Sequence, residues 1–187
     1  MGYEFDVYLS YSRRGNVPVW LFNHLLPNLR DALADEMPSA PDIFVDQNMA
    51  AGMDWPASLE RALLRSRLMV AVLSPRYFVS EWCLAEWMTM SSREREGTAT
   101  EVLIIPVVYS GDINFPDYAR SRRWFDFKAW NIPHELFRST REYGDFHRAV
   151  RQLAADIAER VKTVPEWDAT WEAARPGTAF PSKLPRF

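Results

Sequence analysis

Three short runs of the chain are strongly apolar and have the length of a β-strand. They are residues 3–10, residues 67–74 (RLMVAVLS) and residues 102–109 (VLIIPVVY). The second and third runs are apolar almost throughout, which is typical of strands buried on both faces of a parallel sheet. A shorter run, residues 42–46, predicts a fourth strand, and residues 123–127 predict a fifth strand at an edge of the sheet.

Helical patterns lie between these runs. Apolar residues recur every three or four positions over residues 22–33 and again over residues 146–161. Pro56 is expected to begin a third helix, because proline is tolerated in a first turn, and Ser80 to cap a fourth over residues 81–95. The alternation of strands and helices predicts an α/β protein. We expect a flavodoxin-like three-layer fold, with a central parallel sheet of four or five strands and helices on both faces.

The pattern changes after residue 163, where prolines and large aromatic residues occur without apolar periodicity. They are Pro165, Trp167, Trp171, Pro176, Phe180, Pro181, Pro185 and Phe187. Residues 1–163 are therefore predicted to form one domain and residues 164–187 a C-terminal arm or linker. The aromatic residues favour at least partial docking of this segment on the domain.

The composition excludes several classes of protein. Of the 187 residues, 48% are hydrophobic and 25% are charged, as in an ordinary globular domain. The net charge of −3 lacks the excess of positive charge that nucleic-acid binding needs, so no nucleic-acid partner is expected. A single cysteine, Cys83, excludes an intrachain disulfide and a multi-cysteine zinc site.

The sequence also indicates where the protein is located and whether it binds a metal ion. The chain has no apolar run of the roughly 18 residues that a membrane span needs, and Glu4 and Asp6 stand where a signal peptide would be basic. We therefore expect a cytoplasmic protein with no membrane partner. The three histidines, His24, His134 and His147, are too far apart in the sequence to favour a metal site or a histidine-based triad.

Ligands of open α/β sheets bind at the carboxyl ends of the strands, which directs attention to the residues that follow each strand. These segments carry no dinucleotide-binding glycine fingerprint, no P-loop and no GxSxG nucleophile elbow. They do lie within three distinctive boxes: FDVYLSYSRR at residues 5–14, FVDQNMAAGMDWPASLERALLRS at residues 44–66, and VLSPRYFVSEWCLAEW at residues 72–87. Together these boxes resemble the TIR (Toll/interleukin-1 receptor) domain family, in particular bacterial-style TIR domains that cleave NAD⁺. The resemblance covers roughly residues 3–162.

TIR domains are either scaffolds for signalling assemblies or enzymes that cleave NAD⁺ between nicotinamide and ribose, and the fold alone does not decide between them. Enzymatic members carry a glutamate in a WxxxE segment on the helix after the third strand. Here that segment is Trp82 to Glu86, whose side chains share a face of the helix. The resemblance therefore implies that Glu86 is the catalytic carboxylate. A carboxylate beneath the ribose stabilises the oxocarbenium-like state, and nicotinamide leaves as a neutral molecule without a general acid.

The remaining candidate substrate-binding residues are Ser10, Tyr11, Ser12, Arg13, Arg14, Asp46, Trp55 and Trp82. The arginines would pair with the pyrophosphate of the dinucleotide, and the hydroxyl groups would contact ribose or phosphate. Trp55 would stack on a base or on nicotinamide, and packing in the core or the loop is an equal alternative for it. For Asp46, capping of the following loop is the commonest role of such a residue. Cys83 is interpreted as a small buried residue off the Glu86 face, not as a nucleophile.

The resemblance thus implies an NAD⁺ glycohydrolase that gives nicotinamide and ADP-ribose or a cyclic variant, with NAD⁺ as substrate and no cofactor. Such members act in immune or anti-phage signalling and are activated by self-association through TIR–TIR contacts, which can build filaments. The usual sensor domain is not visible in these residues, so a partner chain supplies it or the sequence is a fragment.

Two alternatives stay open. The first is a non-catalytic TIR scaffold that only assembles. The second is a flavodoxin-like nucleotide-binding or receiver module, which would carry an acidic metal-binding cluster at the end of the first strand, where this chain has residues 10–14 (SYSRR).

Overall fold

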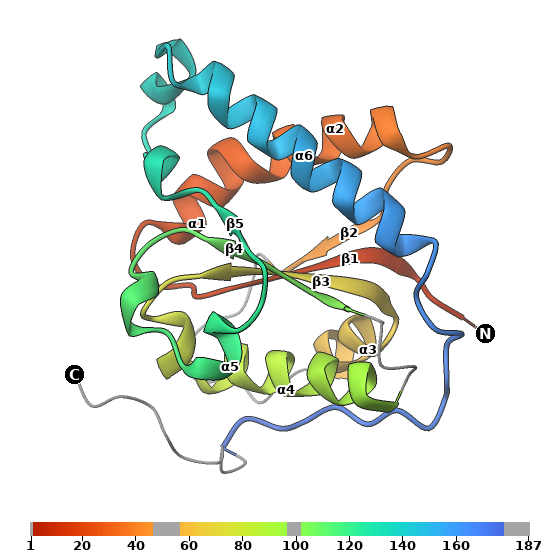
Figure 1. Ribbon diagram of the computed structural model, residues 1–187. Coiled ribbons are helices and arrows are strands. Elements are labelled where there is room, and N and C mark those ends of the chain that lie inside the picture. The colour runs from red at the N-terminus through yellow and green to blue at the C-terminus, as the bar shows by residue number, and fades with distance from the viewer. Residues whose placement is uncertain (1, 47–56, 97–101, 178–187) are drawn as a thin grey trace.

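A parallel sheet of five strands divides the molecule into three layers (Figure 1). The computed structural model describes residues 2–46, 57–96 and 102–177. The strands are β1 (Phe5–Tyr11), β2 (Ile43–Val45), β3 (Ser66–Leu73), β4 (Ile104–Val108) and β5 (Phe125–Asp126). All neighbouring strands pair in parallel, in the order β2-β1-β3-β4-β5. The flavodoxin-like fold expected from the sequence is therefore confirmed.

Burial explains the apolar runs of the central strands. All of β4 and all of β3 except Arg67 are buried, because helices cover both faces of the sheet. The edge strands are shorter and less buried, which is why their sequence patterns are weak. The fifth strand predicted within residues 123–127 is present as the two-residue β5.

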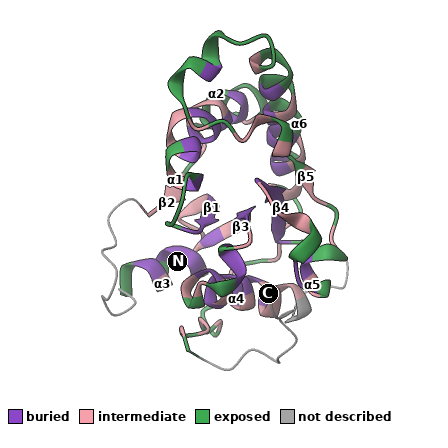
Figure 2. Cartoon of the chain, turned by 90° about the vertical axis from the view of Figure 1, so that its left-hand side faces the viewer, coloured by how far each residue is buried: buried purple, intermediate pink, exposed green. Residues whose placement is uncertain are grey.

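Helices form the two outer layers. On one face lie α1 (Val17–Trp20), η1 (Leu21–Leu25), α2 (Leu26–Glu36) and α6 (Tyr143–Val161). On the other face lie α3 (Ala57–Leu64), α4 (Glu81–Glu96) and α5 (Asp117–Arg120). The short helical turns are η2 (Tyr77–Val79), η3 (Asp112–Asn114), η4 (Lys128–Trp130) and η5 (Glu135–Ser139). Figure 2 shows that the buried residues of both layers face the sheet.

The first helical segment differs from a simple amphipathic helix. It begins at Val17, and its turn Leu21–Leu25 is widened into a π-helix before α2 continues. Pro27 explains the change, because it has no N–H to donate to the carbonyl of Asn23 and its ring crowds that group. The guanidinium of Arg138 donates to this carbonyl instead, at 2.6 Å.

The strand order reverses its direction between β1 and β3. From β1 the chain moves outward to β2 through helices on one face, and then returns to β3 through α3 on the other face. The carboxyl ends of β1 and β3 therefore border the crevice in which open α/β sheets bind ligands. The residues that follow these two strand ends belong to the first box (residues 5–14) and the third box (residues 72–87) of the TIR-like sequence pattern.

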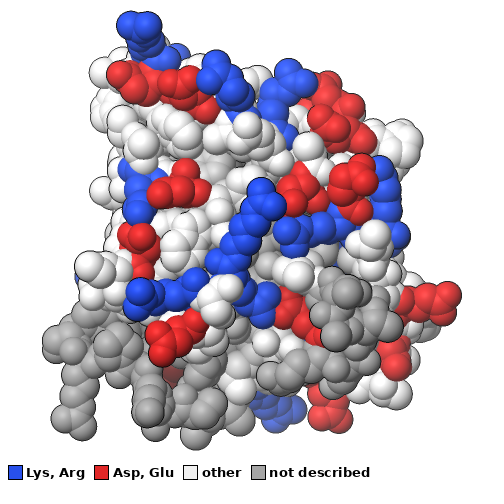
Figure 3. All heavy atoms as spheres, viewed as in Figure 1, with Lys and Arg blue, Asp and Glu red and all other residues white. Residues whose placement is uncertain are grey.

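Two further observations concern the charge on the surface and the length and polarity of the helices. On the face shown in Figure 3, basic and acidic side chains are interspersed, without a broad area of one sign. Across the described residues, no helix combines the length and apolar character needed to cross a lipid bilayer.

Residues 164–177 run from the end of α6 past the amino-terminal ends of β1 and β3 and then along α4 (Figure 1). The indole N–H of Trp167 donates to the carbonyl of Leu64 at 3.2 Å, and the backbone N–H of Ala174 donates to Thr89 Oγ1 at 2.9 Å. Trp171 lies with its ring centre 4.2 Å from the guanidinium carbon of Arg93. This part of the arm is docked on the domain, while Phe180 and Phe187 lie outside the described residues. The division of the chain after residue 163 stays a prediction.

We expect Trp171→Ala to lower the free energy of unfolding by roughly 1–2 kcal/mol, because it removes the ring that covers a buried guanidinium. Chemical denaturation of the full chain measures this change. Glu172→Ala is the matched control, since Glu172 is the exposed neighbour of Trp171. Equal stabilities of the two variants would contradict a stabilising role for arm docking.

Candidate active site

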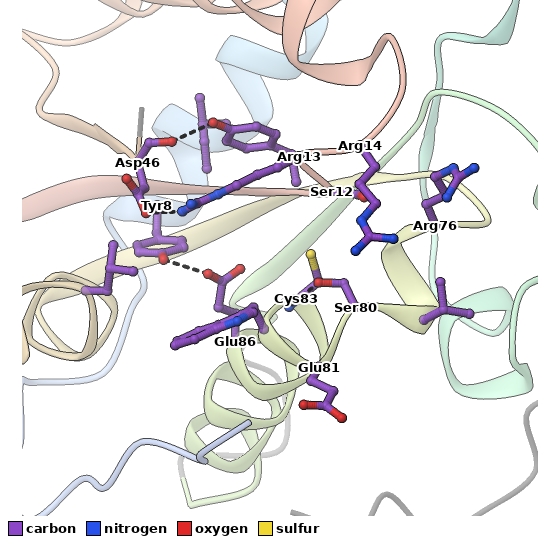
Figure 4. Close-up of a pocket in the computed structure, with 15 residues that line it drawn as sticks. Tyr8, Ser12, Arg13, Arg14, Asp46, Arg76, Ser80, Glu81, Cys83 and Glu86 are labelled. Atoms are coloured by element: carbon purple, nitrogen blue, oxygen red, sulfur yellow. Dashed lines mark hydrogen bonds and ion pairs between the residues drawn. The ribbon is translucent and has the colours of Figure 1, made fainter. Parts of the chain in front are cut away.

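A pocket of about 550 Å³ opens at the carboxyl end of β1, on the side of the sheet covered by α3 and α4 (Figure 4). Its volume is within the range of cavities that enclose small molecules. The lining comes from β1 and the turn after it, the end of β2, α3, η2 and the first turns of α4. The pocket residues used below are Tyr8, Tyr11, Ser12, Arg13, Arg14, Asp46, Arg76, Ser80, Trp82, Cys83 and Glu86.

Glu86 is the buried acid of this pocket, with 8% of its surface exposed. Its Oε1 accepts a hydrogen bond from the hydroxyl of Tyr8 at 2.8 Å, and its Oε2 accepts one from Ser10 Oγ at 2.5 Å. Tyr8 and Ser10 are two residues apart on β1, so both side chains project to the face covered by α4. Ser10 Oγ is also hydrogen-bonded to the hydroxyl of Tyr77 at 2.7 Å.

Burial raises the pKa of Glu86 from its ordinary value of 4.5 to about 7. The hydrogen bonds from Ser10 and Tyr8 act in the opposite direction, because they stabilise the carboxylate. The charge of Arg13 also lowers the pKa, whereas the charge of Asp46 raises it. A carboxyl group with such a pKa in a cleft is typical of functional sites.

An ion pair closes one side of the pocket. The guanidinium of Arg13 contacts the carboxylate of Asp46, which terminates β2 (Figure 4). The hydroxyl of Tyr11 donates to the backbone carbonyl of Asp46 at 2.5 Å. Asp46 is therefore held to the end of β1 by two contacts. Arg13 lines the pocket while it is paired with this carboxylate, and its expected contact with the pyrophosphate of a ligand stays a prediction.

The other side of the pocket is basic. Arg14 and Arg76 line it near Ser80, across the view from Asp46 in Figure 4. Both residues are exposed, and within the described part of the chain neither guanidinium has an ion-pair partner. This end of the pocket suits an anionic group such as a phosphate.

Cys83 lies on the pocket wall together with Glu86, so its expected position off the Glu86 face is wrong. Residues three apart on a helix are neighbours, just as residues four apart are. Burial raises the pKa of the thiol far above its ordinary value, so it stays protonated near neutral pH. A protonated thiol is a poor nucleophile, in keeping with its interpretation as a small buried residue.

The family model described as the TIR domain matches residues 7–141, which is most of the chain. The chain belongs to the TIR domain family. Among the residues that the structure describes, no three His, Cys, Asp or Glu side chains of this TIR domain are grouped so as to hold a metal ion.

Three known proteins are similar to this TIR domain in sequence or in structure. A segment of 66 residues is 36% identical to the disease resistance-like protein CSA1 of Arabidopsis thaliana, which is 35% of this chain and only 5% of that protein. The TIR domain of the Toll-related receptor TRR-2 from Hydra magnipapillata is 19% identical, with a TM-score of 0.50 over 79% of this chain and 98% of that one. The TIR domains of the activated Roq1 resistosome, which recognises the pathogen effector XopQ, are 22% identical, with a TM-score of 0.41 over 83% of this chain and 84% of that one. The Hydra structure supports the fold.

The TIR domain brings most of the expected site residues together. Those that line the pocket are Tyr11, Ser12, Arg13, Arg14, Asp46, Trp82 and Glu86. Ser10 differs, because it is 1% exposed and its hydroxyl lies between Glu86 and Tyr77, so it supports the carboxylate instead of facing a ligand. Trp55 lies outside the described residues.

Tyr8 and Arg76 line the pocket but were not predicted as site residues from the sequence. Tyr8 belongs to an apolar run and was interpreted as part of the buried strand. Its spacing of two from Ser10 is the signal that would have placed its hydroxyl on the same face. Arg76 lies in the third box directly after β3, where its charge marks it as a candidate.

Glu86→Gln is expected to change how stability depends on pH. Glu86 titrates near 4.5 when unfolded and near 7 when folded, so the unfolded chain holds fewer protons between these values and the wild type loses stability as pH rises through them. Glu86→Gln carries a neutral amide at this position, so the variant does not lose stability in this way as pH rises. Relative to the variant, the wild type should therefore lose up to roughly 3 kcal/mol between pH 4.5 and 8.

Urea denaturation of both proteins at several pH values measures this difference. A difference in stability that does not change with pH would show that Glu86 titrates in the folded protein as it does in the unfolded chain.

Proposed function

We propose that this TIR domain is an NAD⁺ glycohydrolase that releases nicotinamide and leaves ADP-ribose or a cyclic variant. NAD⁺ is the substrate, and the reaction needs no further cofactor. The proposal depends on one observation above all: Glu86 places a buried carboxyl group, with a pKa near 7, on the wall of a pocket large enough for a sugar ring.

The chemistry needs one anion at the ribose. The bond between ribose C1′ and the pyridinium nitrogen breaks, and its electron pair neutralises the nitrogen, so nicotinamide leaves uncharged. Positive charge spreads over C1′ and the ring oxygen, where the Glu86 carboxylate stabilises it by hydrogen bonds to the hydroxyls and by its charge. Water then adds to C1′ and loses a proton, which gives ADP-ribose.

The other pocket residues have roles consistent with this arrangement. Arg14, with Arg76, binds the pyrophosphate, since Arg13 is paired with Asp46. Trp82 lies beside Glu86 on the pocket wall and packs on the ribose side of the substrate. Ser12 and Tyr11 contact hydroxyl or phosphate oxygens. For Trp55, which lies outside the described residues, the proposed role is stacking on a base.

The biological setting proposed is immune or anti-phage signalling in the cytoplasm, with activation by self-association through TIR–TIR contacts. The family membership supports this setting, as does the partial similarity to a disease resistance-like protein. A sensor on another part of a longer chain, or on a partner chain, would control the assembly. Head-to-tail contacts of this kind can extend into filaments.

Glu86→Gln is expected to lower nicotinamide release by a factor of roughly 100 or more, because the variant keeps the size of the side chain and removes its charge. The assay incubates NAD⁺ with the protein at high concentration, and also with the protein clustered on a bead surface. Chromatography of the products distinguishes linear from cyclic ADP-ribose.

Glu36→Gln is the matched control, because Glu36 is an exposed glutamate at the end of α2, on the opposite face of the sheet. It should retain wild-type turnover. Inactivity of the wild type and of Glu86→Gln alike, even when clustered, would favour a non-catalytic scaffold. Equal turnover by both would remove Glu86 from the reaction.

A further inference from the structure

The hydroxyl of Tyr8 lies in an unusual place, at the middle of a central strand of the sheet. Tyr8 is 1% exposed, and its ring stacks on Phe44 of β2 with ring centres 5.3 Å apart. Its hydroxyl donates to Glu86 Oε1 at 2.8 Å, and no other hydrogen bond of this hydroxyl occurs within the described residues. A buried phenol on a central strand is costly unless the hydroxyl is bonded, so Tyr8 and Glu86 depend on each other.

The hydrogen bonds around Glu86 have a fixed direction when the carboxyl group is ionised. A carboxylate only accepts, so Tyr8 and Ser10 must both donate to it. The single proton of Ser10 is then used, and Tyr77 must donate to Ser10 Oγ. Burial raises the pKa of both phenols, so each keeps its proton near neutral pH.

A proton on Glu86 weakens this arrangement. A proton placed between Oε2 and Ser10, or between Oε1 and Tyr8, would reverse one of these hydrogen bonds and leave a buried phenol proton without an acceptor within the described residues. A proton that points into the pocket leaves both hydrogen bonds in place, but a protonated carboxyl group is a weaker acceptor than a carboxylate. Both hydroxyls therefore bind the ionised form of Glu86 more strongly.

We propose that Tyr8 is a positioning residue that, together with Ser10, fixes the carboxylate of Glu86 in its orientation and keeps it ionised for the reaction. This inference rests on the proposed function, because it assigns a role to Tyr8 in the same NAD⁺ cleavage. Tyr8 uses one lone pair of Oε1 and Ser10 one of Oε2. The remaining lone pairs are left for the ribose hydroxyls of a bound substrate.

The other charged and titratable groups around Glu86 lie on or next to β1, β2, η2 and α4. Arg13 follows β1 and favours the carboxylate, whereas Asp46 at the end of β2 opposes it. Tyr11 on β1, Tyr77 on η2 and Cys83 on α4 are neutral near pH 7, because burial raises the pKa of each. Tyr8 can be changed without altering any of these groups, so its effect on Glu86 can be measured separately.

Tyr8→Phe keeps the ring that stacks on Phe44 and removes only the hydroxyl. Losing a hydrogen bond to a charged group should raise the pKa of Glu86 by roughly one to two pH units. Nicotinamide release from NAD⁺, measured as kcat/KM against pH so that it reports the free protein, should therefore lose its wild-type rise near pH 7 and rise at a higher pH. Turnover should fall about tenfold or more at pH 6.5 and recover toward the wild-type level near pH 9.

A second readout does not depend on activity. The chemical shift of the Glu86 carboxyl carbon, followed by NMR in protein with ¹³C-labelled glutamate, reports the pKa of Glu86 directly. In Tyr8→Phe this pKa should rise by the same amount as the kinetic pKa. Ser10→Ala, which removes the donor to Oε2, should also raise the pKa of Glu86. Tyr109→Phe is the matched control, because it removes a buried hydroxyl that donates to Asn131 O and not to Glu86.

An unchanged Glu86 titration, or a loss of turnover that is equal at every pH, would overturn the inference and leave only a packing role for Tyr8. If the wild type releases no nicotinamide at any pH, the proposed function fails, and with it the role of Tyr8 in catalysis. The titration then still decides whether Tyr8 controls the charge of Glu86. The two failures are therefore separate results.

Discussion

The sheet of this TIR domain is covered on both faces, so a polar side chain on a central strand must find its partner inside the protein. Tyr8 and Ser10 of β1 find it in Glu86 of α4. The same contacts tie the helix that carries the carboxylate to the strand beneath it. These hydrogen bonds lower the pKa of Glu86 and so oppose the burial that raises it. The charge of the Glu86 carboxyl group and the packing of α4 on β1 depend on the same two hydroxyls.

Much of the fold could be predicted because its signals are local. The runs that became β3 and β4 are apolar throughout, and α6 has a clear helical period. The features that escaped prediction depend on distant partners. The π-helical turn before Pro27 is tolerated because Arg138, more than a hundred residues away, donates to the freed carbonyl. The edge strand predicted within residues 123–127 is present, but its two-residue extent escaped prediction because it is set by pairing with β4.

The site was predictable to the extent that helix geometry determines it. Trp82 and Glu86 were expected on one face and do line one pocket, yet Cys83 shares that wall because it is also within one turn of Glu86. The engagement of Arg13 by Asp46 could not be foreseen, since it joins the ends of two strands 33 residues apart in sequence. The same holds for Ser10, which the sequence suggested as a ligand contact and which lies behind the carboxylate.

The course of residues 164–177 determines where the polypeptide leaves the domain. Helix α6 ends in the layer opposite α4, but the arm passes the amino-terminal ends of the central strands and reaches Thr89 on α4 before the described chain ends at Gly177. A fluorescent protein or affinity tag joined directly to α6 would emerge from one side of the molecule. The same fusion joined directly after Gly177 would emerge from the other side, along the helix that bears Glu86, and Trp167 and Trp171 would hold the connecting segment on the domain.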